Sequence, residues 1–175
     1  SETKAIYKQF ASLLLAPHEV TGGFFISRNQ STATVPSSAA ISSGNDDEIY
    51  VLVGRRALMK DRLNNKNWTI ILSGSNTAGT GGANPLSLTD DSANDNPTST
   101  IAGDRYNIVS GSAGTIVSAA TVKTYGFFYP DHGIMVFSGA ELSASMPGSR
   151  ASGSEVVVLD DKDHKGSAWA TTTNA

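Results

Sequence analysis

Apolar residues are concentrated most strongly in two adjacent runs, 125–129 and 134–137, which Pro130-Asp131-His132-Gly133 separates. The runs consist of aromatic and mostly β-branched residues, which suit a pleated and buried surface. A Pro at the second position of a turn and a Gly at its end fit a tight reversal of the chain. We therefore predict a β-hairpin over 124–139 that faces a core, with Asp131 and His132 serving the turn.

Shorter apolar segments predict further strands. The continuous run Ile-Tyr-Val-Leu-Val within 48–55 indicates a strand that is buried on both faces or centrally placed, and we expect it in the middle of the sheet. In 68–73 the apolar residues alternate, as they do in a half-buried strand. Additional strands are expected at 24–27, 86–90, 104–110 and 155–159, the third of them ended by Gly111. For 116–122 the pattern leaves a weak strand and a short helix open.

One amphipathic helix is predicted at 3–15. Ile6, Phe10, Leu13 and Leu14 follow one another at spacings of four, three and one, so they share an apolar face, and Pro17 should end the helix. A helix of about 12 residues is marginal alone, so this face must dock on this chain or on another. Shorter helical turns are expected at 57–63 and 140–145.

Small polar residues set the remaining organisation. The chain of 175 residues contains 23 Ser, 16 Thr and 17 Gly, and it has long segments that cannot bury enough surface to order themselves. We predict a mainly β protein: an antiparallel sandwich or barrel-like domain with an N-terminal helix and long Ser/Thr/Gly-rich loops, two of them at 28–47 and 74–84. The expected parts are an N-terminal helix and short strand that form a candidate assembly arm (1–27), a polar loop (28–47), a β domain (48–160) and a polar tail (161–175).

Composition excludes several function classes. The formal net charge of −3 gives no broad basic face for nucleic-acid phosphates, and the lack of cysteine excludes disulfides, thiolate nucleophiles and Fe–S clusters. No run approaches the roughly 20 apolar residues that span a bilayer. The chain starts with Ser and not Met, which is consistent with a processed product or an excerpt of a longer protein.

Catalytic and metal-binding motifs are weak. No Gly-x-Ser-x-Gly elbow occurs, and the three histidines are expected in a loop, in the hairpin turn and in the polar tail: His18, His132 and His164. Asp90-Asp91 with 94–96, and separately 160–163, could supply oxygen ligands, but neither follows the spacing of an EF-hand loop. We expect solvated loop acids, with a turn cap as a further role for Asp90. No catalytic residue, metal site or cofactor is predicted.

Arg55, Arg56, Lys60 and Arg62 form the only basic cluster, which Asp61 interrupts. The plain interpretation is a solvated helix face with ion pairs. The alternative is a contact with an acidic partner surface.

Several short segments of the sequence resemble those of a known family. RRALMKDRL at 55–63 is followed by NWTIILSG at 67–74, LTDDS at 88–92, YNIVSGS at 106–112 and YGFFYPDHGI at 125–134. This succession resembles virion structural proteins of contractile-tailed bacteriophages, especially those of marine cyanobacteria. The resemblance covers about 48–142 and contains no catalytic signature.

The resemblance implies a non-enzymatic subunit of a virus particle, in the tail or baseplate, assembled in the host cytoplasm. Its partners would be other copies of itself and other virion proteins, with no nucleic acid, membrane or small-molecule substrate. Assembly contacts are expected on the helix and on the basic cluster, at Ile6, Phe10, Leu13, Leu14, Arg55, Arg56, Lys60 and Arg62. The alternative is a receptor- or carbohydrate-binding module of a phage fibre or adhesin, with sugar stacking on Tyr50, Trp68, Tyr106 or Trp169.

Overall fold

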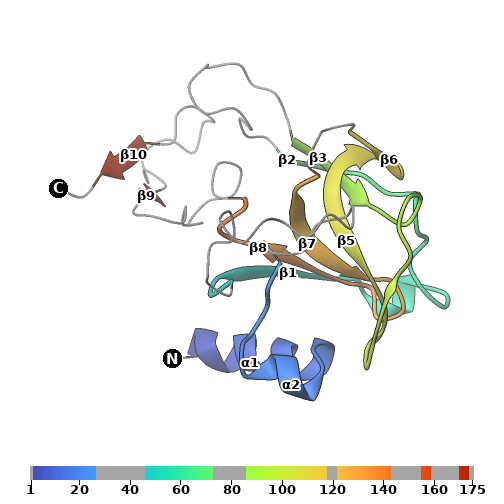
Figure 1. Ribbon diagram of the computed structural model, residues 1–175, viewed down its shortest axis with the longest axis horizontal. Helices are drawn as coiled ribbons and strands as arrows, with labels where there is room; N and C mark the ends of the chain where they lie inside the picture. The colour runs from blue at the N-terminus through green and yellow to red at the C-terminus, as the bar shows by residue number, and fades with distance from the viewer. Residues whose placement is uncertain are drawn as a thin grey trace.

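The computed structural model describes residues 2–26, 46–72, 86–117 and 122–142, together with the backbone of 155–158 and 170–173. Within these ranges the protein is mainly β, with one long helix near its N-terminus. An antiparallel sheet of eight strands curls into a half-barrel, and the helices lie below it in Figure 1. The predicted fold class is confirmed.

The path through the main sheet is β1-β8-β7-β5-β3-β2, and β4 and β6 pair with β5 beside this path. All pairings are antiparallel. The strands are β1 (Ile49–Val53), β2 (Ile70–Leu72), β3 (Leu86–Asp90), β4 (Thr98–Thr100), β5 (Gly103–Ser112), β6 (Thr115–Ile116), β7 (Thr124–Tyr129) and β8 (Ile134–Ser138).

The predicted hairpin forms the centre of the sheet. β7 and β8 pair from Tyr129 opposite Ile134 to Gly126 opposite Phe137, and every residue of β8 is buried. The turn closes through the Gly133 N–H, which donates to the Pro130 carbonyl at 3.2 Å, and Gly133 has a φ of 65°. A Gly adopts this left-handed conformation without the strain of a β-carbon. The sequence prediction for 124–139 is confirmed, including the turn role of Asp131 and His132.

β5 is longer than its apolar pattern predicts. Gly111 does not end the strand, because β5 continues to Ser112 and turns into the short strand β6, with Gly111 opposite Ile116. A β-carbon at Gly111 would collide with the Thr115 carbonyl, so the glycine permits close approach of two strands. β4 pairs with the start of β5 and is not among the predicted strands. Its residues Thr-Ser-Thr carry no apolar signal.

The prediction that β1 lies in the middle of the sheet is wrong. β1 ends the path of the sheet and pairs with β8, and Leu52 and Val53 are exposed. A continuous apolar run does not distinguish a central strand from an edge strand whose surface is left open. Of the helical turns expected at 57–63, one is present as a 3₁₀ turn, η1 (Arg56–Leu58), and 59–63 contains no helix.

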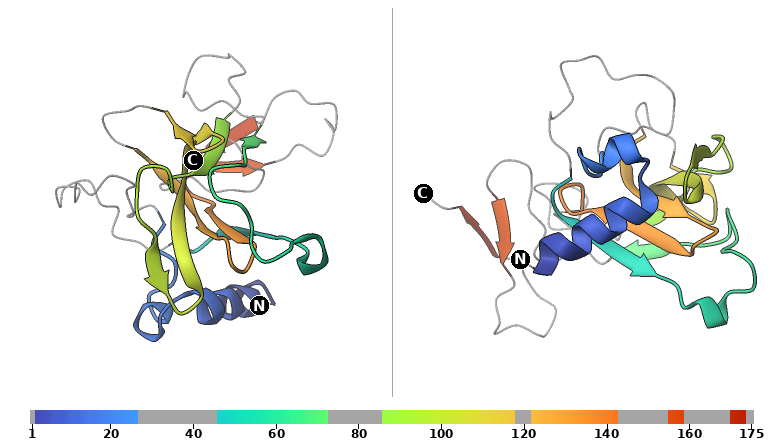
Figure 2. Two further views of the ribbon diagram at one scale, coloured as in Figure 1. Left: turned by 90° about the vertical axis from the view of Figure 1, so that its right-hand side faces the viewer. Right: turned by 90° about the horizontal axis from the view of Figure 1, so that it is seen from below.

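Two helices cover one face of the sheet (Figure 2). α1 (Glu2–Leu14) matches the prediction, and Pro17 does more than end it, since Pro17 begins the short helix α2 (Pro17–Val20). Pro is well suited to the first turn of a helix, where its missing N–H is not needed. The strand expected at 24–27 is absent from its described part, 24–26, which is extended chain packed beneath the sheet.

Buried side chains form two clusters on opposite faces of the central hairpin. Phe127, Tyr129 and Val136 face the helices and pack with Leu14 and Phe24. The intervening residues of the same strands face the inside of the half-barrel, where they join side chains from β3 and β5: Leu86, Leu88, Ile108, Phe128, Met135 and Phe137. The curled sheet is therefore packed on both faces.

β9 (Glu155–Val158) confirms the last predicted strand, and it pairs with β10 (Ala170–Thr173) in a separate two-stranded sheet. β10 falls in the segment that was expected to be a polar tail. The predictions for the loops 28–45 and 74–84, and for the helical turn at 143–145, lie outside the described residues.

Candidate functional site

A groove lies between α1 and the first half of β1. Its volume is about 830 Å³. Apolar side chains from both elements form much of its wall: Ile6, Phe10, Ile49 and Val51. Charged residues stand on both sides, with Lys4 and Lys8 on the helix and Asp47 and Glu48 before the strand. The groove can accept an amphipathic or extended chain segment.

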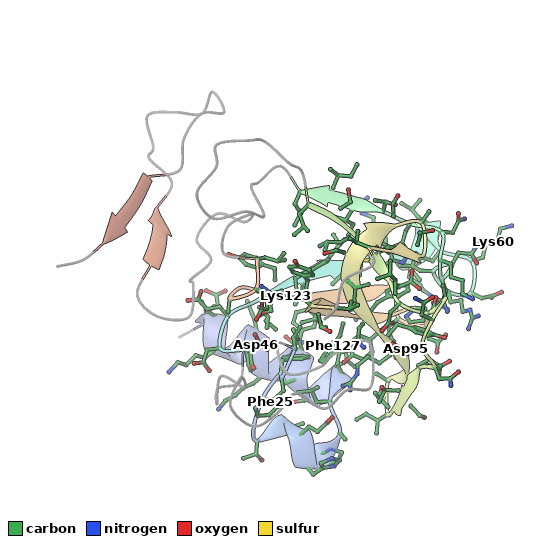
Figure 3. The ribbon with its side chains drawn as sticks, turned by 45° about the horizontal axis from the view of Figure 1, so that its top comes forward. Phe25, Asp46, Lys60, Asp95, Lys123 and Phe127 are labelled. Atoms are coloured by element: carbon green, nitrogen blue, oxygen red, sulfur yellow. The ribbon has the colours of Figure 1, made fainter. Side chains whose placement is uncertain are left out.

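A chain of hydrogen bonds fixes α1 beside β1. The Phe24 N–H donates to the Tyr7 hydroxyl oxygen at 2.9 Å, and the Tyr7 hydroxyl donates to the Asp46 carbonyl at 2.9 Å. The buried Asp46 carboxylate accepts from the Ile26 N–H at 2.6 Å and from the Ser138 hydroxyl. Asp46 thus lies where the helix, the extended segment and β8 meet (Figure 3). Burial raises the pKa of Tyr7, against the lowering effect of its bond from Phe24.

The helix residues predicted as assembly contacts divide into two groups. Leu14 is fully buried in the core with Ala11 and Leu15, so it offers no surface and is withdrawn as a contact. Phe10 is partly buried against the same cluster. Ile6 and Leu13 remain 49% and 47% exposed. The apolar face is therefore wider than the part that the chain's own core covers.

Strand β1 and the turn after it carry a second group of exposed apolar side chains. Leu52 is 53% and Val53 54% exposed, and Leu58 in η1 is also exposed. Sequence reasoning missed these residues because it placed β1 in the middle of the sheet. The adjacent charges were a usable signal, since Asp47-Glu48 and Arg55-Arg56 bracket the apolar run as charges often bracket an edge strand.

The basic cluster does not act as one unit. Arg56 donates to the carbonyls of Asp61 at 3.0 Å and Asp131 at 3.3 Å, and Arg62 lies 4.0 Å from the Asp131 carboxylate. These two arginines attach the segment after β1 to the hairpin turn. One ion pair is present, but the helix face that the interpretation assumed is limited to the single turn η1. Arg55 and Lys60 are exposed, and Lys60 extends away from the body of the protein in Figure 3.

The expectation of solvated loop acids at 90–91 is wrong. Asp90 and Asp91 are buried. Asp90 accepts from the Lys66 N–H at 3.0 and 3.2 Å and from the Ser92 hydroxyl, so it connects the end of β3 to the segment before β2. Asp91 accepts from the N–H and the side-chain amide of Asn107 at 3.0 and 2.9 Å. Both carboxylates therefore serve the fold at the end of β3.

The residues weighed for catalysis or metal binding lie apart. His18 lies in α2 and His132 in the hairpin turn, while His164 and 160–163 are outside the described residues. Within the described ranges no three His, Asp or Glu side chains come close enough to hold a metal ion. The same ranges contain no helix of the length and apolarity that a bilayer crossing requires.

The aromatic residues of the carbohydrate-binding alternative are mostly engaged in packing. Trp68 meets Phe128 edge to face, with ring centroids 5.3 Å apart, and Tyr50 and Tyr106 pack partly against the same cluster. Trp169 is outside the described residues.

Comparison with known proteins adds no further assignment. Neither a protein-family model, nor a curated protein, nor a solved structure matches this chain.

Proposed function

We propose that this protein is a structural subunit of a bacteriophage particle, in the tail or baseplate, and that it acts through contacts between subunits. The observation that carries the proposal is the set of exposed apolar side chains on α1, β1 and η1, which are Ile6, Leu13, Leu52, Val53 and Leu58, together with the groove that Ile6 helps to line. Single exposed apolar residues are ordinary, but several of them on neighbouring elements are typical of an interaction site.

The resemblance of 48–142 to virion proteins of contractile-tailed phages supports the same role. The motifs that could carry catalysis are used for folding instead: Asp90 and Asp91 accept hydrogen bonds from the backbone, and Asp131 and His132 belong to a turn. A non-enzymatic virion subunit thus accounts for both the resemblance and the exposed surface.

The test is mass spectrometry of gradient-purified phage particles from the source of this sequence. Peptides of this chain should co-purify with the particles at a constant ratio to a tail protein through two successive gradients. A replication enzyme of the same phage serves as the control and should be lost. If peptides of this chain are lost with that control, the proposed function fails.

A further inference from the structure

The outer edge of β1 presents backbone hydrogen-bonding groups that no described strand pairs with. Among the described strands, β1 pairs with β8 alone. The Gly54 N–H donates to the Gly133 carbonyl at 2.8 Å, and the Gly139 N–H donates to the Glu48 carbonyl at 2.9 Å. Backbone groups alternate in direction along a strand, so those of even-numbered residues face β8 and those of Ile49, Val51 and Val53 face outward. Such an edge is a template for another strand.

Two side chains in the second half of this edge are also exposed. Leu52 and Val53 are adjacent in the strand, so they point to opposite faces of the sheet, and each is more than half exposed. On the helix side, the groove leaves space beside Ile49 and Val51. A strand added at this edge would cover apolar surface on both faces at once.

The charges at the two ends of β1 indicate which strand fits. Asp47 and Glu48 precede β1 and Arg55 and Arg56 follow it, and all four are exposed. A second β1 that runs antiparallel places its basic end beside the acidic end of the first, and the reverse holds at the other end. The edge is therefore complementary to itself, which is what a twofold interface requires.

We propose that two copies of this chain associate by antiparallel pairing of their β1 strands about a twofold axis at Val51, which joins the two half-barrels into one continuous sheet. Directly opposed residues of an antiparallel pair point to the same face, so a twofold axis must set one residue opposite itself. Val51 is the middle of β1 and has outward backbone groups. This inference rests on the proposed role of the chain as an assembling subunit.

This register defines the contacts between the copies. Val53 of each copy lies opposite Ile49 of the other, and Leu52 lies opposite Tyr50. Asp47 lies opposite Arg55, which is exposed, whereas Arg56 already donates to the carbonyls of Asp61 and Asp131. The exposed half of each strand thus covers the groove-lining half of the other.

The first experiment is a charge exchange, measured by light scattering and analytical ultracentrifugation on the full 175-residue chain. Asp47→Arg alone and Arg55→Asp alone each replace two attractive contacts by repulsive ones, so each should weaken dimerisation about tenfold at low salt. The combined D47R/R55D variant restores opposite charges across the axis and should recover the wild-type dissociation constant. D61R, which changes the same charge outside β1, should leave dimerisation unchanged.

The second experiment uses the absence of cysteine from the chain. Val51→Cys places two thiols opposite each other in a hydrogen-bonded pair, where Cα atoms lie roughly 5.5 Å apart, within the range of a disulfide. Mild oxidation should give a covalent dimer. Ile71→Cys, on the exposed strand β2 at the opposite end of the sheet path, should stay monomeric under non-reducing electrophoresis.

Two results of the solution experiments would overturn β1 pairing: a protein that is monomeric at all concentrations, or a dimer whose dissociation constant does not respond to the single charge changes. Cross-linking through Ile71→Cys in place of Val51→Cys would also overturn it. So would the finding that, in purified particles, β1 pairs with a different protein and not with a second copy of this chain. Circular dichroism on each variant verifies that it is folded. A chain that is found in particles but fails these tests overturns the pairing and leaves the structural role intact. A chain that pairs through β1 but is lost from particles overturns the structural role alone.

Discussion

The hydroxyl of Tyr7 donates to the backbone carbonyl of Asp46 at 2.9 Å, across 39 positions of sequence. This bond joins the amphipathic helix to the residues that lead into β1. It therefore determines where α1 lies relative to the edge of the sheet, and with it the shape of the groove between them.

Tyr7→Phe should destabilise the protein by about 2 kcal/mol, because it removes the acceptor of the buried Phe24 N–H and the hydroxyl's own bond to the Asp46 carbonyl. The free energy of unfolding, measured by urea denaturation, provides the test. Tyr125→Phe is the matched control and should change stability by less than about 0.5 kcal/mol. Equal effects of the two substitutions would mean that the Tyr7 hydroxyl does not hold the helix.

Gly126→Ala should disrupt the centre of the sheet. A β-carbon at Gly126 would collide with the Val136 carbonyl and would lie 3.3 Å from the Phe137 Cα, so the two strands of the hairpin would have to separate. We expect a loss of at least about 2 kcal/mol in the free energy of unfolding. The control Ser99→Ala, on the exposed part of β4, should be close to neutral. A fully stable G126A variant would contradict the register of β7 and β8.

Asp91→Ala removes two hydrogen bonds from Asn107 to a buried carboxylate, and it should cost about 3 kcal/mol because bonds to charged groups are the stronger ones. Asp61→Ala, at an exposed position, is the control. Thermal unfolding of the two variants, followed by circular dichroism, distinguishes them. If D91A and D61A melt together, Asp91 does not stabilise the junction of β3 and β5.

Alkaline pH should unfold the protein partly through Tyr129. Burial raises the pKa of this phenol from 10.0 to about 12, and the opposing effect of Arg105 is smaller. The folded state holds the phenol proton more tightly than the unfolded state does. The contribution of protonated Tyr129 to the free energy of unfolding is therefore complete below pH 10 and is lost as the pH rises toward 12. The full loss corresponds to about 3 kcal/mol.

The measurement is the free energy of unfolding at pH 7 and from pH 9 to 11.5, for the wild-type protein and Tyr129→Phe. The wild-type protein should lose stability more steeply above pH 10 than the variant does. Parallel curves would show that Tyr129 does not titrate with folding.

The sequence determined the elements whose signals are local. The hairpin at 124–139 combines dense apolar strands with a Pro and a Gly in its turn, and the helix near the N-terminus shows its apolar spacing within four turns. Each signal depends on neighbouring residues alone, so the strands, the turn and the antiparallel β class could be predicted before any tertiary contact was known.

Tertiary structure decided which side chains are buried and which stay exposed. The apolar run Ile49–Val53 is compatible with both a central strand and an edge strand. Only the strand order of the sheet places it at one end, with Leu52 and Val53 exposed. Leu13 and Leu14 both belong to the predicted apolar face of the helix, yet Leu14 is buried and Leu13 is not. Asp90 and Asp91 resemble loop acids until Lys66 and Asn107 are brought to them from distant segments. Burial is a property of the whole packing, since it depends on which segments meet, and the candidate assembly surface is what that packing leaves uncovered.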